Sequence, residues 1–328
     1  MRRRDLDMTD QLQRGRVYCN GISKRAADVD TDAYPEASPH VFWRFMFANG
    51  TSLRTAKERL SMKKKTLGIV GAGAIGQALL RGLQSGSAPF KIWAATRTPQ
   101  SAARIERDFS ITATDEYDEL VPETDVVLVC VKPAQTDATL ERLRKAGLKK
   151  HALVISVAAG VSIAALERAI GDDVAVIRAM PNVPALVSEG MTVIALGRHV
   201  TKDQASEATD IFKSVGRCIE LPEHHLNAVT AISGCGPAYV FLIIEALADA
   251  GVSVGLPRDV ARELVAQTVL GASKMVQDSE RHPAAMRDDV TTPAGCTIGA
   301  LLVLEDGKIR SVLARAIAEA TRIAGTLA

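Results

Sequence analysis

Apolar residues follow two different patterns along this chain, and the change lies near Pro222. Between residues 65 and 221, short apolar runs alternate with segments in which apolar residues recur every three or four positions. The runs are typical of buried parallel strands, and the recurring spacing is typical of amphipathic helices. Their alternation predicts a doubly wound α/β sheet, with antiparallel pairing left open for its last strands, 191–196 and 218–221.

After Pro222 the spacing is helical only, with apolar-striped segments at 238–250, 257–276 and 314–324. A small domain built from residues 224–328 buries less apolar surface than these helices carry. We therefore expect an all-α dimerisation domain whose core is completed by a second copy. The assembly is then a homodimer or a dimer-based higher oligomer.

Residues 1–61 differ from both of these regions. They carry mixed charge, an isolated aromatic patch at 42–45 and no sustained periodicity. The arginines at positions 2–4 are followed at once by acidic residues, whereas transit peptides are poor in acids. We expect a disordered or loosely attached extension, or an upstream-start artefact, because Met62 leads directly into the first strand.

A glycine-rich turn follows the first apolar run, in the stretch Leu67-Gly-Ile-Val-Gly-Ala-Gly-Ala-Ile-Gly76. In a strand-turn-helix unit, Gly71 makes the turn, Gly73 lets the backbone approach a pyrophosphate, and Gly76 lets the helix pack closely on the strand. The amides at the helix N-terminus face an anion. Three glycines also occur at any close helix-strand crossing, but the flanking strand and helix favour dinucleotide binding and a Rossmann-type domain.

The residues after the second strand, 91–95, indicate which dinucleotide is bound. An acidic residue that binds the ribose 2'-hydroxyl is expected there, and the sequence instead has Thr96 and Arg97. A guanidinium and a hydroxyl suit a 2'-phosphate, so we expect NADPH, with NADH also possible. The alternative is that Arg97 is an ordinary surface arginine.

Two further strand ends point to the same crevice, because ligands of doubly wound sheets lie beyond the carboxyl ends of the strands. The strand 125–131 contains Cys130 and continues into Lys132 and Pro133. The strand 151–157 continues into Ala158-Ala159-Gly160, where small residues leave room for a nicotinamide ring. For Lys132 the alternative is a solvated strand end.

The loop 291–298, Thr-Thr-Pro-Ala-Gly-Cys-Thr-Ile, joins two helices through small residues. Exposed amides at the start of the helix 297–304 would receive a small carboxylate. Thr297 is a candidate cap that also donates its hydroxyl to a substrate, and the alternative is a capped helix after a turn. Glu280 is a second candidate, with a solvated carboxylate as the alternative.

Composition excludes other classes of function. The net charge is +2 and the basic residues are scattered, which argues against nucleic acid. Five widely spaced cysteines indicate reduced thiols in a cytoplasmic protein, with no metal site. The longest apolar runs, such as 239–248 with Glu245, fall short of a membrane span. No nucleophile lies beside a base, so a cofactor is expected to carry the chemistry.

Taken together, these segments resemble pyrroline-5-carboxylate reductase from Leu67 to Leu327. Seven stretches carry the resemblance, and the three that lie in the helical half, 236–239, 280–283 and 293–298 in that order, are specific to the family. The matching stretches are 68–73, 131–133, 158–160, 178–182, 236–239, 280–283 and 293–298.

The resemblance implies reduction of 1-pyrroline-5-carboxylate to L-proline by hydride from NAD(P)H, the last step of proline biosynthesis. It implies a Rossmann domain at 62–223 and a helical substrate and dimerisation domain at 224–328. The implied cofactor-binding residues are Val70, Gly71, Ala72, Gly73, Ala74, Ile75, Thr96, Arg97, Cys130, Val131, Lys132, Pro133, Val157, Ala158 and Ala159. The implied substrate-binding residues are Glu280, Thr292, Gly295, Cys296 and Thr297, with Thr297 as the catalytic residue.

Two departures from the family pattern lie near these positions. Ala294-Gly295 stands where two glycines are common, and Cys235 stands where serine is common. Two other functions remain as alternatives. A related small-imine or β-hydroxyacid reductase would use the same plan, but hydroxyacid enzymes need a lysine general acid on the helix after the cofactor domain. A non-catalytic NADPH sensor would have no use for the loop 291–298.

Overall fold

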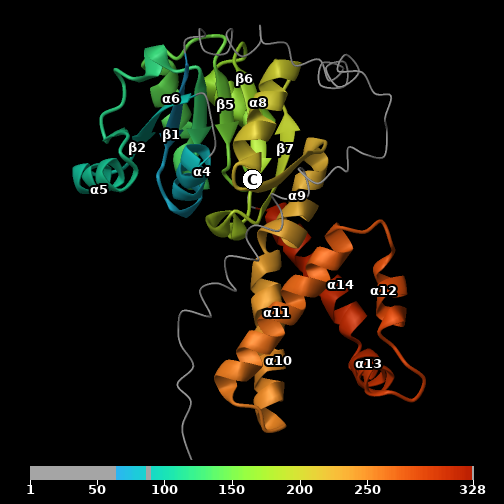
Figure 1. Cartoon of the computed structure of the whole chain (residues 1–328). Helices are drawn as coiled ribbons and strands as arrows, with labels where there is room; N and C mark the ends of the chain where they lie inside the picture. Colours follow the sequence, from blue (N-terminus) through green and yellow to red (C-terminus); the bar gives the residue numbers. More distant parts are fainter. Residues whose placement is uncertain (1–63, 86–89, 327–328) are drawn as a thin grey trace, which may run out of the picture. The chain divides into compact units, whose positions relative to one another are not determined.

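The computed structural model describes residues 64–85 and 90–326. The extension expected over residues 1–61 lies outside this part of the chain. The strands form a single eight-stranded sheet with the order β3-β2-β1-β4-β5-β6-β7-β8 (Figure 1). The strands are β1 (Lys65–Val70), β2 (Phe90–Ala95), β3 (Thr112–Thr114), β4 (Val126–Val129), β5 (Leu153–Ser156), β6 (Ala175–Met180), β7 (Gly190–Leu196) and β8 (Gly216–Glu220).

The strand order confirms the doubly wound sheet. The strands β3-β2-β1-β4-β5-β6 all run parallel to one another, β7 is antiparallel to β6, and β8 is parallel to β7. The order reverses between β1 and β4, and ligands of such sheets bind at this switch point. The antiparallel pairing left open by the sequence therefore occurs once, between β6 and β7.

The central strands β4 and β5 are buried at every position because helices cover both faces of the sheet. On one face, α4 (Ala74–Ser85) and α8 (Lys202–Lys213) bury side chains that include Leu79 and Phe212. On the other face, α6 (Thr136–Lys145) and α7 (Ile163–Ile170) bury side chains that include Leu140 and Leu166. Helix α7 is capped at its start, since the Ser162 hydroxyl accepts a hydrogen bond from the Ala165 amide at 3.2 Å.

Helix α5 (Pro99–Phe109) follows β2 and is fixed at both ends. The Thr98 side chain accepts a hydrogen bond from the Ser101 amide at 3.3 Å, and Pro99 occupies the first turn, where proline is favoured. At the other end, Phe109 packs into the sheet core. The first turn of α5 is thus held directly beyond the carboxyl end of β2.

The chain after β8 is helical. Its helices are η6 (Glu223–His225), α9 (Leu226–Val229), η7 (Thr230–Gly234), α10 (Gly236–Ser253), α11 (Arg258–Gln277), α12 (Pro283–Asp289), α13 (Cys296–Asp306) and α14 (Ile309–Ala324). Helix α10 continues through Gly251, which the spacing had placed at its end. A Cβ at Gly251 would lie 3.1 Å from the Ala261 side chain, so this glycine serves the close packing of α10 on α11.

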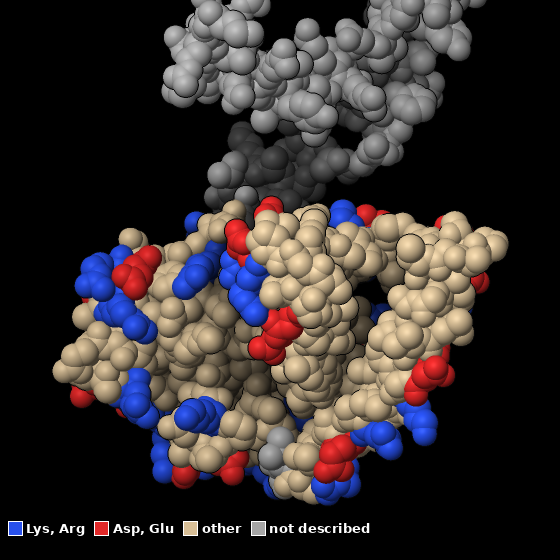
Figure 2. Space-filling view, turned by 90° about the horizontal axis from the view of Figure 1, so that it is seen from below, with Lys and Arg blue, Asp and Glu red and all other residues tan. Residues whose placement is uncertain are grey.

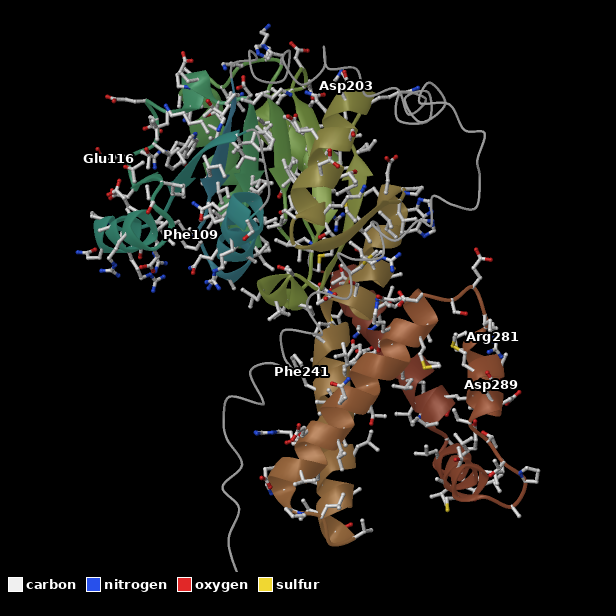
Figure 3. The ribbon with its side chains drawn as sticks, in the orientation of Figure 1. Phe109, Glu116, Asp203, Phe241, Arg281 and Asp289 are labelled. Carbon is white, nitrogen blue, oxygen red and sulfur yellow. The ribbon has the colours of Figure 1, made fainter. Side chains whose placement is uncertain are left out.

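Within the described residues, one helical run, Glu223–Ser253, is long and apolar enough to cross a membrane by length and composition. The expectation that the apolar runs fall short of that length was wrong, because the segment before α10 joins it without a break. Its apolar side chains are largely uncovered in the single chain: Phe241 is 62% exposed and Leu242 is 64% exposed (Figure 3). A helical surface of this kind fits the partner copy expected from the sequence.

The side chains of Glu223 and Asn182 connect the sheet to the helical half by hydrogen bonds. The Glu223 carboxylate accepts hydrogen bonds from the Ile163 amide at 2.7 Å and from the Arg178 guanidinium at 3.1 Å. The Asn182 amide donates to the Ser233 carbonyl at 3.1 Å. These contacts tie the start of α7 and the end of β6 to the first helical turns after the sheet.

We expect Glu223→Ala to lower the free energy of unfolding by about 2–4 kcal/mol, because it leaves the Arg178 side chain, 9% exposed, without its partner. Replacing both groups in Arg178→Met/Glu223→Ala should restore part of the loss. Urea unfolding of the single and double variants measures both. A double variant as unstable as the sum of the two single variants would contradict this account.

Candidate functional site

A groove of about 660 Å³ lies at the carboxyl ends of β1, β2 and β4, on the switch point of the sheet. It is formed by the loops after these three strands and by the groove-facing sides of α5 and α6. Its lining residues are Val70, Gly71, Ala72, Gly73, Ala95, Thr96, Arg97, Thr98, Ser101, Arg104, Tyr117, Cys130, Val131, Lys132, Ala134, Gln135, Ala138, Thr139 and Arg142.

The glycines of the β1–α4 turn have different surroundings. Gly71 has a φ of +101°, and a Cβ on it would lie 2.7 Å from the Cys130 carbonyl oxygen. A Cβ on Gly76 would lie 2.5 Å from the Gly71 carbonyl oxygen, so this glycine lets α4 approach the turn. Around Gly73 there is open space within 4 Å. The protein itself gives no packing reason for a glycine at 73, which leaves room for a ligand to approach the backbone.

The groove is strongly cationic. Four basic side chains line it, Arg97, Arg104, Lys132 and Arg142, and its lining contains no carboxylate. Figure 2 shows Lys and Arg side chains gathered over the left part of this face, on the side where α5 lies in Figure 1. A pocket with this charge favours a polyanion.

Arg142 differs from the other three cations because its charge is already matched. Its guanidinium bonds Asp118 at 2.7 Å and lies 4.1 Å from the centre of the Tyr117 ring. Within the described part of the chain, Arg97, Arg104 and Lys132 form no ion pair. Those three charges remain available to a bound anion.

The two titratable neutral groups of the groove stay protonated near neutral pH. Burial raises the pKa of the Cys130 thiol to about 12. Burial also raises the pKa of Tyr117, whose ring stacks on Trp93 at 5.8 Å. The positive charge of the groove is therefore not offset by a thiolate or a phenolate.

Most of the residues expected to bind the cofactor are brought together by this groove. Nine line it: Val70, Gly71, Ala72, Gly73, Thr96, Arg97, Cys130, Val131 and Lys132. The other six, which lie outside the lining at the start of α4, after Lys132 and after β5, are Ala74, Ile75, Pro133, Val157, Ala158 and Ala159. Ala158 is 3% exposed in the single chain.

The sequence interpretation missed Ser101, Arg104, Tyr117 and Arg142. For Ser101 and Arg104 a signal was present, because positions three apart share a face of a helix and both follow Arg97. For Tyr117 and Arg142 there was none. They lie on separate segments that meet only in the folded chain.

The residues expected to bind the substrate lie together around the start of α13. Gly295 precedes this helix and accommodates Thr292, whose hydroxyl would collide with a Cβ at position 295. The expectation that Thr297 caps the helix was wrong: the capping position is Gly295, with no side-chain cap, and Thr297 is already within α13. The Thr297 hydroxyl is thus not used as a cap.

Ala294 has a left-handed backbone with a φ of +56°. This is the position where the sequence departs from the double glycine, and a left-handed residue other than glycine costs about 1–2 kcal/mol. Arg281, which follows Glu280 and precedes α12, bonds Asp289 at the end of that helix at 2.6 Å (Figure 3).

None of the five expected substrate-binding residues lines the groove. Helix α13 packs against α14, and Figure 1 shows α12 and α13 beside α14 rather than beside the strand ends. One chain therefore holds the two halves of the expected site apart.

Two family models match separate parts of the chain. A family model described as pyrroline-5-carboxylate reductase dimerisation matches residues 223–327. A model described as NADP oxidoreductase coenzyme F420-dependent matches residues 66–160.

Curated pyrroline-5-carboxylate reductases are similar over most of the chain. The protein from Synechocystis sp. is 42% identical over 260 residues, which are 78% of this chain and 96% of that protein. The protein from Escherichia coli is 39% identical over 256 residues, 77% of this chain and 95% of that protein.

Solved structures of pyrroline-5-carboxylate reductases are also similar to this chain. A pyrroline-5-carboxylate reductase from Coxiella burnetii matches with a TM-score of 0.76 and 33% identity, over 81% of this chain and 99% of that one. The Plasmodium falciparum pyrroline carboxylate reductase with NADP bound matches with a TM-score of 0.72 and 30% identity, over the same shares.

The glycine geometry predicts opposite behaviour for two variants. Gly73→Ala should leave the melting temperature unchanged and weaken NADPH binding at least about tenfold, because its Cβ enters free space that the ligand needs. Gly71→Ala should weaken binding and also lower stability by about 2 kcal/mol or more, because alanine is strained at a φ of +101° and meets a carbonyl. Thermal unfolding and NADPH fluorescence titration separate the two. Equal stability losses would refute this assignment.

Proposed function

The chain belongs to the pyrroline-5-carboxylate reductase family, and on this basis we propose which of its residues carry out the family's reaction. The reaction is reduction of 1-pyrroline-5-carboxylate to L-proline with hydride from NAD(P)H, the final step of proline biosynthesis. The observation that supports the assignment most directly is a cationic groove without carboxylates at the switch point of the sheet. The residues from 223 onward match the family's dimerisation model.

We propose that NADPH occupies this groove. The open space at Gly73 and the amides at the start of α4 suit a pyrophosphate, and Arg97 with Thr96 suits a 2'-phosphate. The segment Val157–Ala159 would support the nicotinamide, beyond the carboxyl end of β5. When bound, the cofactor supplies the hydride.

The imino acid would bind at the start of α13. Amides at Gly295, Cys296 and Thr297 lie at the start of the 11-residue helix α13 and suit the substrate carboxylate. The Thr297 hydroxyl, which caps nothing, would hydrogen-bond the ring nitrogen and help to keep it protonated. Because one chain holds α13 away from the groove, the α13 of a second copy would complete the site.

The role of the residues is then mainly to align two molecules. A protonated imine already accepts hydride readily, so alignment of the two reacting carbons and exclusion of water supply most of the rate. The apolar side chains of the dimerisation helices would help to exclude water. No acid-base triad is required.

The β-hydroxyacid reductase alternative lacks its general acid. The helical run that follows the cofactor domain, residues 226–253, contains no lysine. The NADPH-sensor alternative gives no role to the amides and free hydroxyl at the start of α13.

We also propose the boundaries and the location. The cofactor domain would span residues 62–223 and the helical domain 224–328, with residues 1–61 as an extension. A cytoplasmic location is supported by Cys130, Cys218, Cys235 and Cys296, which are all free thiols.

The activity test follows NADPH oxidation with 1-pyrroline-5-carboxylate, with the keto acid that corresponds to a small hydroxyacid, and without substrate. We expect turnover with the imine alone, and slower turnover with NADH. Turnover with the keto acid would favour the hydroxyacid alternative. NADPH binding without any turnover would favour the sensor.

Thr297→Val should lower kcat, because it removes one hydrogen bond in a dry site that stabilises the transition state by about 1–3 kcal/mol. The affinity for NADPH should be unchanged. Thr209→Val is the matched control, since the Thr209 hydroxyl bonds the Ala205 carbonyl within α8 at 2.9 Å, outside the proposed site. Steady-state kinetics and cofactor titration give both values. Equal turnover in the two variants would remove Thr297 from the mechanism.

A further inference from the structure

Helix α5 directs a second arginine into the groove. Arg104 lines it together with Arg97, Thr98 and Ser101, although it lies seven positions after Arg97 in the sequence. We propose that Arg104 is a cofactor-selecting residue, and that it binds the 2'-phosphate of NADPH together with Arg97. This inference rests on the proposed binding of NADPH in the groove.

Helix α5 lies where the 2'-phosphate of a bound dinucleotide is expected. The 2'-hydroxyl end of a dinucleotide lies just beyond the second strand of a Rossmann-type sheet. Here that place is the loop Thr96–Thr98 and the first turn of α5. Arg97 approaches it from the loop, and Ser101 and Arg104, three positions apart, approach it from one face of the helix.

Charge carries the second step. Arg104 and Arg97 form no ion pair within residues 64–85 and 90–326, and no carboxylate lines the groove beside them. A phosphate monoester carries up to two negative charges and three acceptor oxygens, so two guanidinium groups match it better than one. A ribose with a free 2'-hydroxyl carries no negative charge at this position.

The other two cations of the groove are placed for other tasks. Arg142 is bonded to Asp118 and covers the Tyr117 ring, so it forms part of the wall. Lys132 follows β4, on the far side of the switch point from α5. Selection between NADPH and NADH therefore falls to Arg97 and Arg104.

The test measures binding rather than turnover. Dissociation constants for NADPH, NADH, 2',5'-ADP and 5'-ADP are determined by calorimetry for the wild type, Arg97→Ala, Arg104→Ala and the double variant. Arg107→Ala is the matched control, because Arg107 lies on the same helix, pairs with Asp108 and does not line the groove.

We expect Arg104→Ala to weaken NADPH and 2',5'-ADP about tenfold and to change NADH and 5'-ADP less than twofold. The double variant should lose most of the preference for NADPH, and Arg107→Ala should match the wild type. Unchanged NADPH binding in Arg104→Ala overturns the inference. Equal weakening of NADPH and NADH binding also overturns it, because Arg104 would then contact the portion of the cofactor that the two molecules share.

The controls separate this inference from the proposed function. Retained NADH binding and an unchanged melting temperature show that Arg104→Ala is folded. A wild type that binds NADPH no more tightly than NADH contradicts both this inference and the proposed cofactor. A wild type that prefers NADPH, with an Arg104→Ala variant that keeps the full preference, contradicts this inference alone.

Discussion

The close approach of Gly71 to the Cys130 carbonyl is the contact on which the site depends. The chain leaves β1, turns at a φ of +101° and crosses the end of β4 at a distance that excludes any Cβ. Because the turn passes so closely, α4 begins directly after the switch point, and the turn residues Gly71, Ala72 and Gly73 line the groove. A larger residue at 71 would displace the start of α4 and the loop after β4 together.

The two halves of the molecule offer different surroundings to an anion. In the sheet half, three cations that form no ion pair with any residue the structure describes line a groove that suits the phosphates of a dinucleotide. In the helical half, the start of α13 offers backbone amides and a small loop, which suit one carboxylate. The larger positive charge thus lies where the larger negative charge is expected.

The sequence predicted the features that depend on local patterns. The order of strands and helices and the turn at Gly71 each follow from spacing within a short segment. Errors arose where tertiary contacts decide. Gly251 was expected to end a helix and instead lets two helices cross closely, and Thr297 lies inside α13 because Gly295 takes the capping position.

The candidate site was predictable in part for the same reason. The glycine turn and the strand ends could be found from their motifs, whereas Arg104 and Arg142 enter the groove only through the packing of α5 and α6. The placement of α13 against a groove cannot be predicted from one chain at all, because the single fold holds them apart.

The uncovered apolar face of α10 makes maturation of this protein a two-stage process. The sheet half buries its own core within one chain, whatever the number of copies present. The helical half, with Phe241 and Leu242 open to water, reaches its final packing only by encounter of two copies, which is second order in chain. Each newly made chain is therefore first a monomer with an exposed apolar surface. This monomer persists for a shorter time when synthesis is faster, because the concentration of chains is then higher.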